Sequence, residues 1–547
     1  MRKALLTTLL VCLSCTLSWA CTNFLVGKNA SVDGSTFVTY SADSYSLFGE
    51  LYHWPAAKYA PGDMLSVYEW DTSKYLGQIP QVAETYNVVG NMNEYQLCIG
   101  ETTWGGRDEL VDSLGIMDYG SLIYITLQRA KTAREAITVM TDLVANHGYY
   151  SSGESFSIVD KNEVWVLEMI GKGPGNKGAV WVAVRIPDDC ISAHANQARI
   201  HQFPLNDPEN CKYSKDVISF AKKQGYYKGN DKNFSFSKAY NPLDWGGLRS
   251  CEARVWTFFN QVTDNAEQWI PYILGQDPTP MPLYLKPNRK LSVEDMMHFM
   301  RDHYEGTPFD PTQDVAAGPF GSPYRFNPLS FTYKDKKYTF ERPISTQQTG
   351  FTFVGQMRSW LPDPVGGVLW FGVDDAKFSV YTPMYAGITE VPLCYRHGNG
   401  DLVSFSWESA FWIHNWVAQM AYARYSQMIE DTMPVQHALE SGFVEALKTR
   451  DNEIAKALQT DKKKATAMMN SFSQDCAERE VTAWKKLGEY LLVKYMDGVV
   501  KKEENGRFIY NEYGGAQYPN RPQYKDEFLQ RIVDDKGAWL EQKPIKQ

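Results

Sequence analysis

The first twenty residues, together with the cysteine that follows them, constrain this chain more than any other feature. They read MRKALLTTLLVCLSCTLSWA: two basic residues, an apolar run, and small residues at the two positions that a signal peptidase reads. The apolar run is too short to span a bilayer as a stable helix. We therefore predict that residues 1–20 are a secretory signal peptide and that the exported chain begins at Cys21. An uncleaved signal anchor is the alternative.

Three fates are open to Cys21 at the start of an exported chain: a lipid anchor, a structural cysteine, or a nucleophile. A lipoprotein signal normally carries Leu three residues before the cysteine, whereas this chain has Ser18 there, followed by the bulky Trp19. This departure disfavours the lipid anchor without removing it. The structural cysteine and the nucleophile both remain compatible with the sequence.

The nucleophile hypothesis has a simple physical basis. An N-terminal cysteine brings a thiol with a pKa of about 8.5 and an α-amine with a pKa of about 8 together in one residue. The free amine can take the thiol proton near neutral pH, directly or through water, so one residue supplies both nucleophile and base. Activity would then appear only after cleavage behind Ala20, in the periplasm, outside the cell or at its surface.

The charge and hydropathy of the chain argue against a nucleic-acid partner and against a membrane-spanning segment. The 547 residues carry a net charge of −9, and the strongest basic run, at 462–464, lies in a charge-mixed helical stretch. Because phosphate binding needs clustered Lys and Arg, we do not expect a nucleic-acid partner. The Trp-rich segment 405–425 is interrupted by Glu408 and Arg424, so it predicts a buried amphipathic helix, and we expect no integral membrane segment after signal removal.

The cysteines are few and widely spaced. Two of the nine lie in the predicted signal and form the chain's CxxC pair, which leaves seven from Cys21 onward. An odd number leaves at least one thiol unpaired, while the other six allow up to three disulfides or none. With the CxxC pair removed and no HExxH motif present, we expect no metal site and no cofactor. The oligomeric state stays open, a homo-oligomer included.

Hydrophobic patterns divide the chain after the signal into two parts. Residues 21–400 alternate strands with helices and contain a loop-rich stretch at 201–345, whereas 401–547 is mostly helical up to about residue 500. The clearest expected elements are a hairpin from CTNFLVGKN to TFVTYSAD, helices over 118–145, a strand pair in SFSIVDKNEVWVLEM, and strands in VWVAVRIPDD, CISAHANQARI, FTFVGQMR and GGVLWFGVDD.

Several ordered blocks carry a family resemblance that covers roughly residues 21–500. The blocks are CTNFLVGKNASVDGST, GNMNEYQLCIGETTWGG, ESFSIVDKNEVWVLEM, ISAHANQARI, PDPVGGVLWFGVDDAKFSVYTPMYAGITEVP and SWESAFWIHNWVA. Any one block is a weak signal, but the six blocks in this order are specific. With them the chain resembles the dipeptidase A family of cysteine peptidases, within the N-terminal-nucleophile (Ntn) hydrolases, with bile-salt and penicillin-V amidases as more distant relatives.

The resemblance implies a fold and a set of site residues. The implied fold is α+β: an αββα four-layer sandwich over residues 21–400, followed by the helical extension at 401–547. Motif by motif, it implies Cys21 as nucleophile, Asp43 in TYSADSY at the amine and thiol, Asn196 in SAHANQARI at the oxyanion site, Arg254 in SCEARVW beside the nucleophile, and Thr102 in GETT as a second oxyanion contact.

Two positions depart from the pattern of the amidases. The Arg usually found three residues before the Asp is Tyr40 here, which removes a cation from the surroundings of the thiolate. The amidases carry Asn where this chain has Thr102, which suits a different class of substrate. The neighbouring Glu101 is interpreted as capping a strand.

The resemblance implies hydrolysis of dipeptides or short peptides through Cys21. Two alternatives stay open. One is an acyl-amide hydrolase of the same fold, and the other is an exported lipoprotein binding module with Cys21 lipidated and no catalysis.

Overall fold

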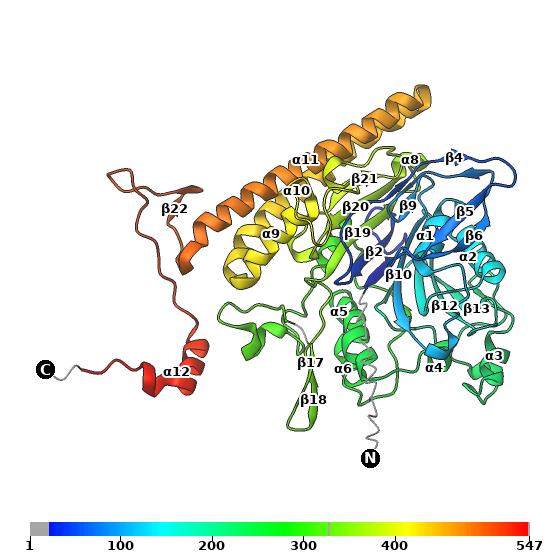
Figure 1. The fold of residues 1–547 in the computed structure, drawn as a ribbon, viewed down its shortest axis with the longest axis horizontal. Helices are drawn as coiled ribbons and strands as arrows, with labels where there is room; N and C mark the ends of the chain where they lie inside the picture. Colours follow the sequence, from blue (N-terminus) through cyan, green and yellow to red (C-terminus); the bar gives the residue numbers. More distant parts are fainter. Residues whose placement is uncertain (1–20, 327–328, 545–547) are drawn as a thin grey trace, which may run out of the picture.

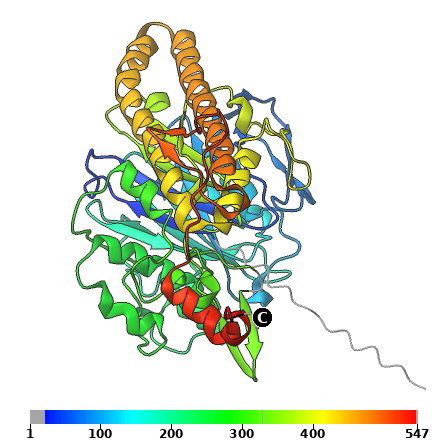
Figure 2. The same ribbon diagram turned by 90° about the vertical axis from the view of Figure 1, so that its left-hand side faces the viewer.

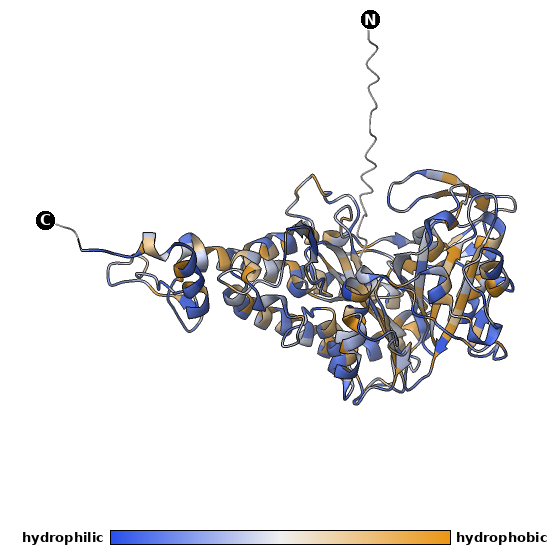
Figure 3. Cartoon of the chain, turned by 90° about the horizontal axis from the view of Figure 1, so that it is seen from below, coloured by the Kyte–Doolittle hydropathy of each residue, from blue (hydrophilic) through white to orange (hydrophobic). Residues whose placement is uncertain are grey.

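The computed structural model describes residues 21–326 and 329–544 and is a mixed α and β protein with two large antiparallel sheets (Figure 1). The predicted signal at 1–20 lies outside the described residues. The strands of the large sheets are almost entirely buried and form the interior, which is coloured hydrophobic in Figure 3.

The first large sheet has seven strands. The predicted hairpin is confirmed, because β1 (Asn23–Val26) and β2 (Thr36–Asp43) pair antiparallel with Leu25 opposite Val38. The longest strands lie at the centre of the sheet, where both faces are covered. In spatial order the strands are β16 (Tyr284–Leu285), β14 (Ile191–His194), β1 (Asn23–Val26), β2 (Thr36–Asp43), β19 (Thr349–Met357), β20 (Gly367–Val373) and β21 (Thr382–Tyr385).

The second large sheet has eight strands. It contains the predicted strand pair, which turns at residues 160–163 between β11 (Gly153–Val159) and β12 (Val164–Gly171). In spatial order the strands are β15 (Cys211–Tyr213), β13 (Ala179–Ile186), β12 (Val164–Gly171), β11 (Gly153–Val159), β10 (Cys98–Gly105), β9 (Met92–Asn93), β8 (Val88–Val89) and β3 (His53–Trp54).

The two sheets meet where β1 and β2 lie against β10. Gly100 on β10 permits the close approach, because a Cβ at this position would lie 2.5 Å from the side-chain amide of Asn23 on β1. Residues larger than glycine would push the sheets apart here. The contact brings the start of the described chain next to the segment that follows Gly100.

Helices cover the outer faces of both sheets. Two of them, α1 (Tyr119–Leu127) and α2 (Ala133–His147), fill the predicted 118–145 stretch and pack near the eight-stranded sheet. The Thr132 side chain caps α2 by accepting from the Glu135 N–H. The seven-stranded sheet packs against α9 (Ala410–Ala423), which is the predicted buried helix, and against α10 (Tyr425–Thr460) and α11 (Lys462–Tyr495).

The long helices α10 and α11 form an antiparallel pair that projects beyond the sheets (Figure 2). Their sheet-proximal parts share one core with the strands, to which Phe443 and Trp484 contribute. The segment after α11 extends away from this core, and its helix α12 (Asp526–Leu540) has no buried residue.

The loop-rich stretch at 201–345 contains short helices as well as loops. The helices here are α3 (Val217–Lys223), α4 (Phe236–Tyr240), α5 (Ala253–Val262), α6 (Ile270–Ile273) and α7 (Val293–Phe299), with α8 (Asp363–Gly366) following later. Small two-stranded sheets pair β4 (Ala57–Lys58) with β7 (Glu84–Thr85), β5 (Met64–Tyr68) with β6 (Tyr75–Pro80), β17 (Ser330–Tyr333) with β18 (Lys336–Thr339), and β22 (Glu503–Glu504) with β23 (Arg507–Phe508).

Two further findings concern the cysteines and the helices of the described residues. All seven cysteines from Cys21 onward are unpaired in the described structure. None of the helices described here combines the length and apolar content that crossing a membrane requires.

A buried ion pair fastens α10 to the seven-stranded sheet and generates a stability prediction. Arg358, which follows β19, forms a two-pronged salt bridge with Asp451 on α10, and Tyr385 on β21 donates to the same carboxylate at 2.9 Å. Asp451→Ala leaves the Arg358 charge buried without its partner, so we expect a loss of about 3–5 kcal/mol in the free energy of unfolding. Urea unfolding followed by circular dichroism measures the loss.

The matched control is the neighbouring exposed pair of Arg450 and Glu453. Because water screens this pair, Glu453→Ala should cost no more than about 1 kcal/mol. Equal losses for Asp451→Ala and Glu453→Ala would contradict the role of the buried pair.

Candidate active site

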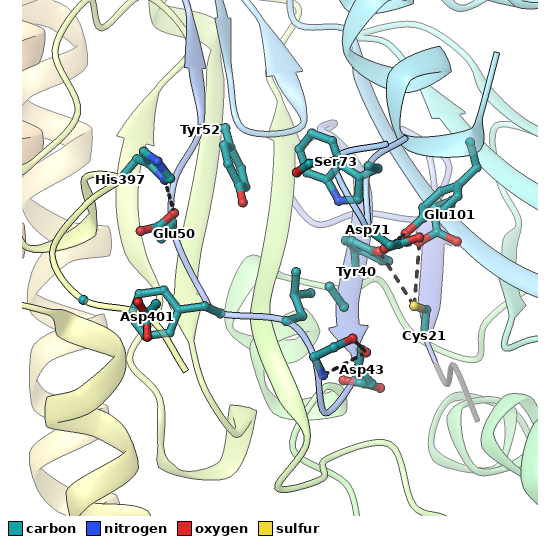
Figure 4. Close-up of a pocket in the computed structure, with 18 residues that line it drawn as sticks. Cys21, Tyr40, Asp43, Glu50, Tyr52, Asp71, Ser73, Glu101, His397 and Asp401 are labelled. Atoms are coloured by element: carbon teal, nitrogen blue, oxygen red, sulfur yellow. Dashed lines mark hydrogen bonds and ion pairs between the residues drawn. The ribbon is translucent and has the colours of Figure 1, made fainter. Parts of the chain in front are cut away.

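Cys21 lies two residues before the start of β1 and lines a cavity of about 420 Å³ (Figure 4). Its side chain is buried, with 3% of its surface exposed. Strand β2 holds the residue in place because Thr22 forms a β-bridge with Ser41, whose N–H donates to the Thr22 carbonyl at 3.1 Å. The predicted nucleophile therefore faces a cavity large enough for a small ligand.

Two polar side chains lie beside the Cys21 sulfur. The Sγ atom is 3.7 Å from Tyr40 Oη and 3.7 Å from Glu101 Oε1, and Tyr40 donates a short hydrogen bond to the same Glu101 oxygen. Burial raises the pKa of the Cys21 thiol well above its ordinary value, and the charges of Glu101 and Asp43 raise it further. In this environment the sulfur is held as a neutral thiol.

Arg254 holds the backbone of Cys21 in place through a hydrogen bond to its carbonyl. It sits on α5 just after a turn of π-helix, Gly247–Glu252, and is 1% exposed. All five of its N–H groups have acceptors: the carbonyls of Cys21 (2.7 Å), Ser250 (2.6 Å) and Ala195 (3.2 Å), Thr22 Oγ1 (2.8 Å) and Asn196 Oδ1 (2.9 Å). The structure thus brings the predicted Arg254, Asn196 and Cys21 together.

Asn196 follows β14 and has left-handed backbone geometry, with φ of 60°. Asn tolerates this region better than most residues. Its amide is oriented at both ends, because Nδ2 donates to the Thr103 carbonyl at 2.5 Å while Oδ1 accepts from Arg254. An amide NH₂ carries two N–H groups, so an oriented Asn196 can also donate to a developing oxyanion.

Asp43, at the end of β2, lines the same cavity as Cys21 and is paired with a cation that the sequence did not reveal. Arg342 donates to Asp43 Oδ2 at 2.6 Å, and Thr349 donates to Oδ1 at 2.7 Å. Both members of the ion pair are buried. The amidases carry an Arg three residues before this aspartate, where the present chain has Tyr40. A guanidinium nevertheless reaches Asp43, and it comes from Arg342, 299 residues further along the chain.

The Thr102 hydroxyl contacts His194 and lies outside the cavity beside Cys21. Its Oγ1 is 2.7 Å from His194 Nδ1, and the other ring nitrogen of His194 is 2.7 Å from Ser157 Oγ. Burial lowers the pKa of His194 to about 3, so the imidazole is neutral and occupied by hydroxyl partners. Thr102 does not line the cavity beside Cys21. Its part in an oxyanion site stays a prediction, and its hydroxyl is already engaged by His194.

A second cavity, of about 580 Å³, shares Asp71 and Tyr119 with the first and is also lined by Asn196. Asp71 lies on the connection between β5 and β6 and accepts from Tyr119 Oη at 2.9 Å. Burial, followed by nearby carboxylates including that of Glu101, raises the pKa of Asp71 to about 7. Among the described residues no group of His, Cys, Asp and Glu has the arrangement of a metal site.

Sequence reasoning missed Glu101 as well as Arg342. Glu101 was expected to cap a strand, yet its carboxylate contacts both Cys21 and Tyr40. The signal available in the sequence was its place in the GETT segment of a block that resembles the peptidases. Arg342 lies in a loop with no pattern that would single it out.

Comparison with known proteins identifies the family of this chain. A model of peptidase family C69 matches residues 20–53 and 50–438. A probable dipeptidase of Latilactobacillus sakei is 26% identical over 443 residues, which cover 77% of this chain and 85% of the relative. A probable dipeptidase of Salmonella dublin is 28% identical over 392 residues, 68% of this chain and 81% of the relative.

A longer match comes from probable dipeptidase B of Streptococcus pyogenes serotype M1, which is 23% identical over 503 residues. It covers 87% of this chain and 93% of the relative. Because the family model spans more than half of the chain and the matched region includes the buried cysteine and its partners, this protein belongs to peptidase family C69 and is a peptidase.

Proposed function

We propose that this protein is an exported dipeptidase whose nucleophile is the thiol of Cys21, freed at the N-terminus when residues 1–20 are removed. The observation that carries the proposal is the placement of Cys21. Its thiol faces a cavity of about 420 Å³, its carbonyl is held by Arg254, and it directly follows a signal-like segment. The relatives named probable dipeptidase support the choice of substrate.

Removal of the signal would change the charge next to the Cys21 sulfur. While residues 1–20 remain attached, the Cys21 nitrogen is an uncharged peptide nitrogen, and burial with two carboxylates keeps the thiol protonated. Cleavage converts this nitrogen into an α-amine, which when protonated places a positive charge within the same residue as the sulfur. A nearby positive charge favours the thiolate, so cleavage would activate the nucleophile.

The reaction then runs in two halves. The α-amine takes the thiol proton, the sulfur bonds to the peptide carbonyl carbon, and the resulting oxyanion receives hydrogen bonds from Asn196 and backbone N–H groups. As the C–N bond breaks, the ammonium returns its proton to the leaving amine. A water molecule, deprotonated by the same amine, attacks the thioester, and release of the acyl group restores the thiol.

We also propose that the fold is the αββα four-layer sandwich of Ntn hydrolases. Support comes from the contacts between the two antiparallel sheets and from the helices on their outer faces. An N-terminal strand that begins beside the cavity, as β1 does, suits a chain whose first residue performs the chemistry.

An acyl-amide hydrolase is the second candidate, and the character of the cavity disfavours it. The residues around Cys21 include apolar ones such as Leu47 and Phe48, but five carboxylates among them suit a charged substrate better than an acyl chain: Asp43, Glu50, Asp71, Glu101 and Asp401. The third candidate, a lipidated binding module, would consume the sulfur that the cavity presents.

Mass analysis joined to a dipeptide screen tests the proposed function. We expect the secreted protein to begin at Cys21 with a free amine and thiol and to hydrolyse dipeptides. Cys21→Ala should lower kcat by at least about a thousandfold, because the nucleophile is lost. Cys21→Ser is the matched control for side-chain size. A diacylglycerol adduct, a different first residue, or undiminished turnover by Cys21→Ala would refute the proposal.

Asn196 provides a separate test of the oxyanion site. Asn196→Gly removes the amide without straining a backbone that has positive φ, so the fold should tolerate it better than Asn196→Ala. Losing one oxyanion donor should lower kcat by about 10²–10³-fold with little change in KM. Steady-state kinetics measure this, with the unfolding midpoint as the control. An unchanged kcat would exclude Asn196 from the oxyanion site.

A further inference from the structure

The cavity beside Cys21 and the neighbouring cavity that shares Asp71 with it are lined by several carboxylates and by no lysine or arginine side chain. Five acidic residues line the first cavity. The second adds Glu69, Asp108 and Glu154 and shares Asp71 with the first. Clefts lined by one sign of charge concentrate ligands of the opposite sign. The region around the thiol is therefore suited to a positively charged group.

Two of these carboxyls are buried with an oxygen left unsatisfied. Glu101 is 1% exposed and Glu154 is fully buried. No group of the other described residues donates to Glu101 Oε2 or Glu154 Oε1. Burial, the charge of Glu101 and a side-chain hydrogen bond with Glu101 raise the pKa of Glu154 well above its ordinary value, so a protonated Glu154 can share its proton with Glu101 while no cation reaches either carboxyl. A buried carboxylate without a cation is costly, so an incoming cation would be strongly stabilised there.

The position of Glu101 matches the covalent geometry of a dipeptide. The α-nitrogen of the first residue lies about 2.5 Å from the carbonyl carbon that is attacked. In a near-attack arrangement that carbon is about 3–3.5 Å from the sulfur. Glu101 Oε1 lies 3.7 Å from Cys21 Sγ. An ammonium that contacts the Glu101 carboxylate therefore holds its own carbonyl within reach of the thiol.

The Glu101 carboxylate is also held in place. Tyr40 donates to its Oε1 atom, and Figure 4 shows Glu101 and Asp71 on the Cys21 side of the cavity. Asp71, whose Oδ1 accepts from Tyr119, lies at the boundary of the two cavities. Orientation by neighbouring hydroxyls is what a recognition carboxylate needs if its partner is to be positioned and not merely attracted.

We propose that Glu101 binds the α-ammonium group of the substrate and so makes a free N-terminus the feature that this enzyme recognises. The inference rests on the proposed peptidase chemistry of Cys21 and identifies the group that selects its substrate. An N-acylated peptide replaces the ammonium with a neutral amide and leaves the Glu101 carboxylate without a cation. Such peptides should therefore be poor substrates.

The test compares substrates that differ only at the amine. L-Ala-L-Ala carries the ammonium, its C-terminal amide keeps the ammonium but lacks the carboxylate, and propionyl-L-Ala lacks the ammonium. For the secreted protein we expect kcat/KM to favour both free-amine substrates. Glu101→Gln keeps the shape and an acceptor for Tyr40, and it should lower kcat/KM for these two by about 30-fold. The value for propionyl-L-Ala should change much less.

Glu50→Gln is the matched control. It removes a charge from the opposite wall of the same cavity, where Glu50 is already committed to His397 Nδ1 at 2.6 Å and the Gly398 N–H at 3.1 Å (Figure 4). We expect it to leave the preference for the free amine intact. If Glu50→Gln and Glu101→Gln reduced that preference alike, a general effect of cavity charge would replace the specific role of Glu101.

A binding measurement separates recognition from chemistry. In the Cys21→Ala background, calorimetry should show L-Ala-L-Ala binding weakened about 30-fold by Glu101→Gln, with N-acetyl-L-Ala-L-Ala unaffected. Equal losses for amine and acyl substrates, or unchanged binding of the dipeptide, would overturn the role of Glu101. Failure of the unaltered secreted protein to hydrolyse any dipeptide would instead overturn the proposed function, so the two failures are distinguishable.

Discussion

The guanidinium of Arg254 is the interaction on which the organisation of the site depends. It is buried, and each of its five N–H groups donates to an acceptor: two carbonyls from the segments that flank it, two groups at Cys21 and Thr22, and the side chain of Asn196. None of these acceptors is a carboxylate. One side chain thus locks the start of β1, the end of β14 and α5 into a single geometry, and displacing it would disturb all three.

Much of the fold could be predicted because local patterns and tertiary structure agree. The strands β1, β2, β11 and β12 are short runs bounded by turn residues and are buried along their whole length, and the buried residues of α9 recur at helical spacing. The helices within residues 201–345 were harder to predict from the sequence, because short helices contain few repeats of a hydrophobic pattern. The close packing of the sheets at Gly100 depends on a contact between distant segments, which no local pattern contains.

For the site, too, short motifs predicted some residues, whereas contacts between distant segments were not predictable. Cys21 and Arg254 were predicted from short motifs, and the structure places them in direct contact. Thr102 was assigned by position in a motif, but its hydroxyl faces His194. Arg342 and Glu101 escaped notice because their importance comes from what they touch. A guanidinium reaches Asp43 from a loop 299 residues away, and a residue that looked like a strand cap lies against the sulfur.

The concentration of acidic side chains around the thiol has a consequence for how ligands arrive. The carboxylates of the cavity that have no cationic partner extend a negative potential, over roughly a Debye length of 8 Å at physiological ionic strength. Zwitterions with a lysine or arginine side chain would be drawn in faster than those with aspartate or glutamate. Added salt would reduce this difference in association rate. The enzyme would therefore begin to discriminate between basic and acidic ligands during diffusional encounter, before any direct contact forms.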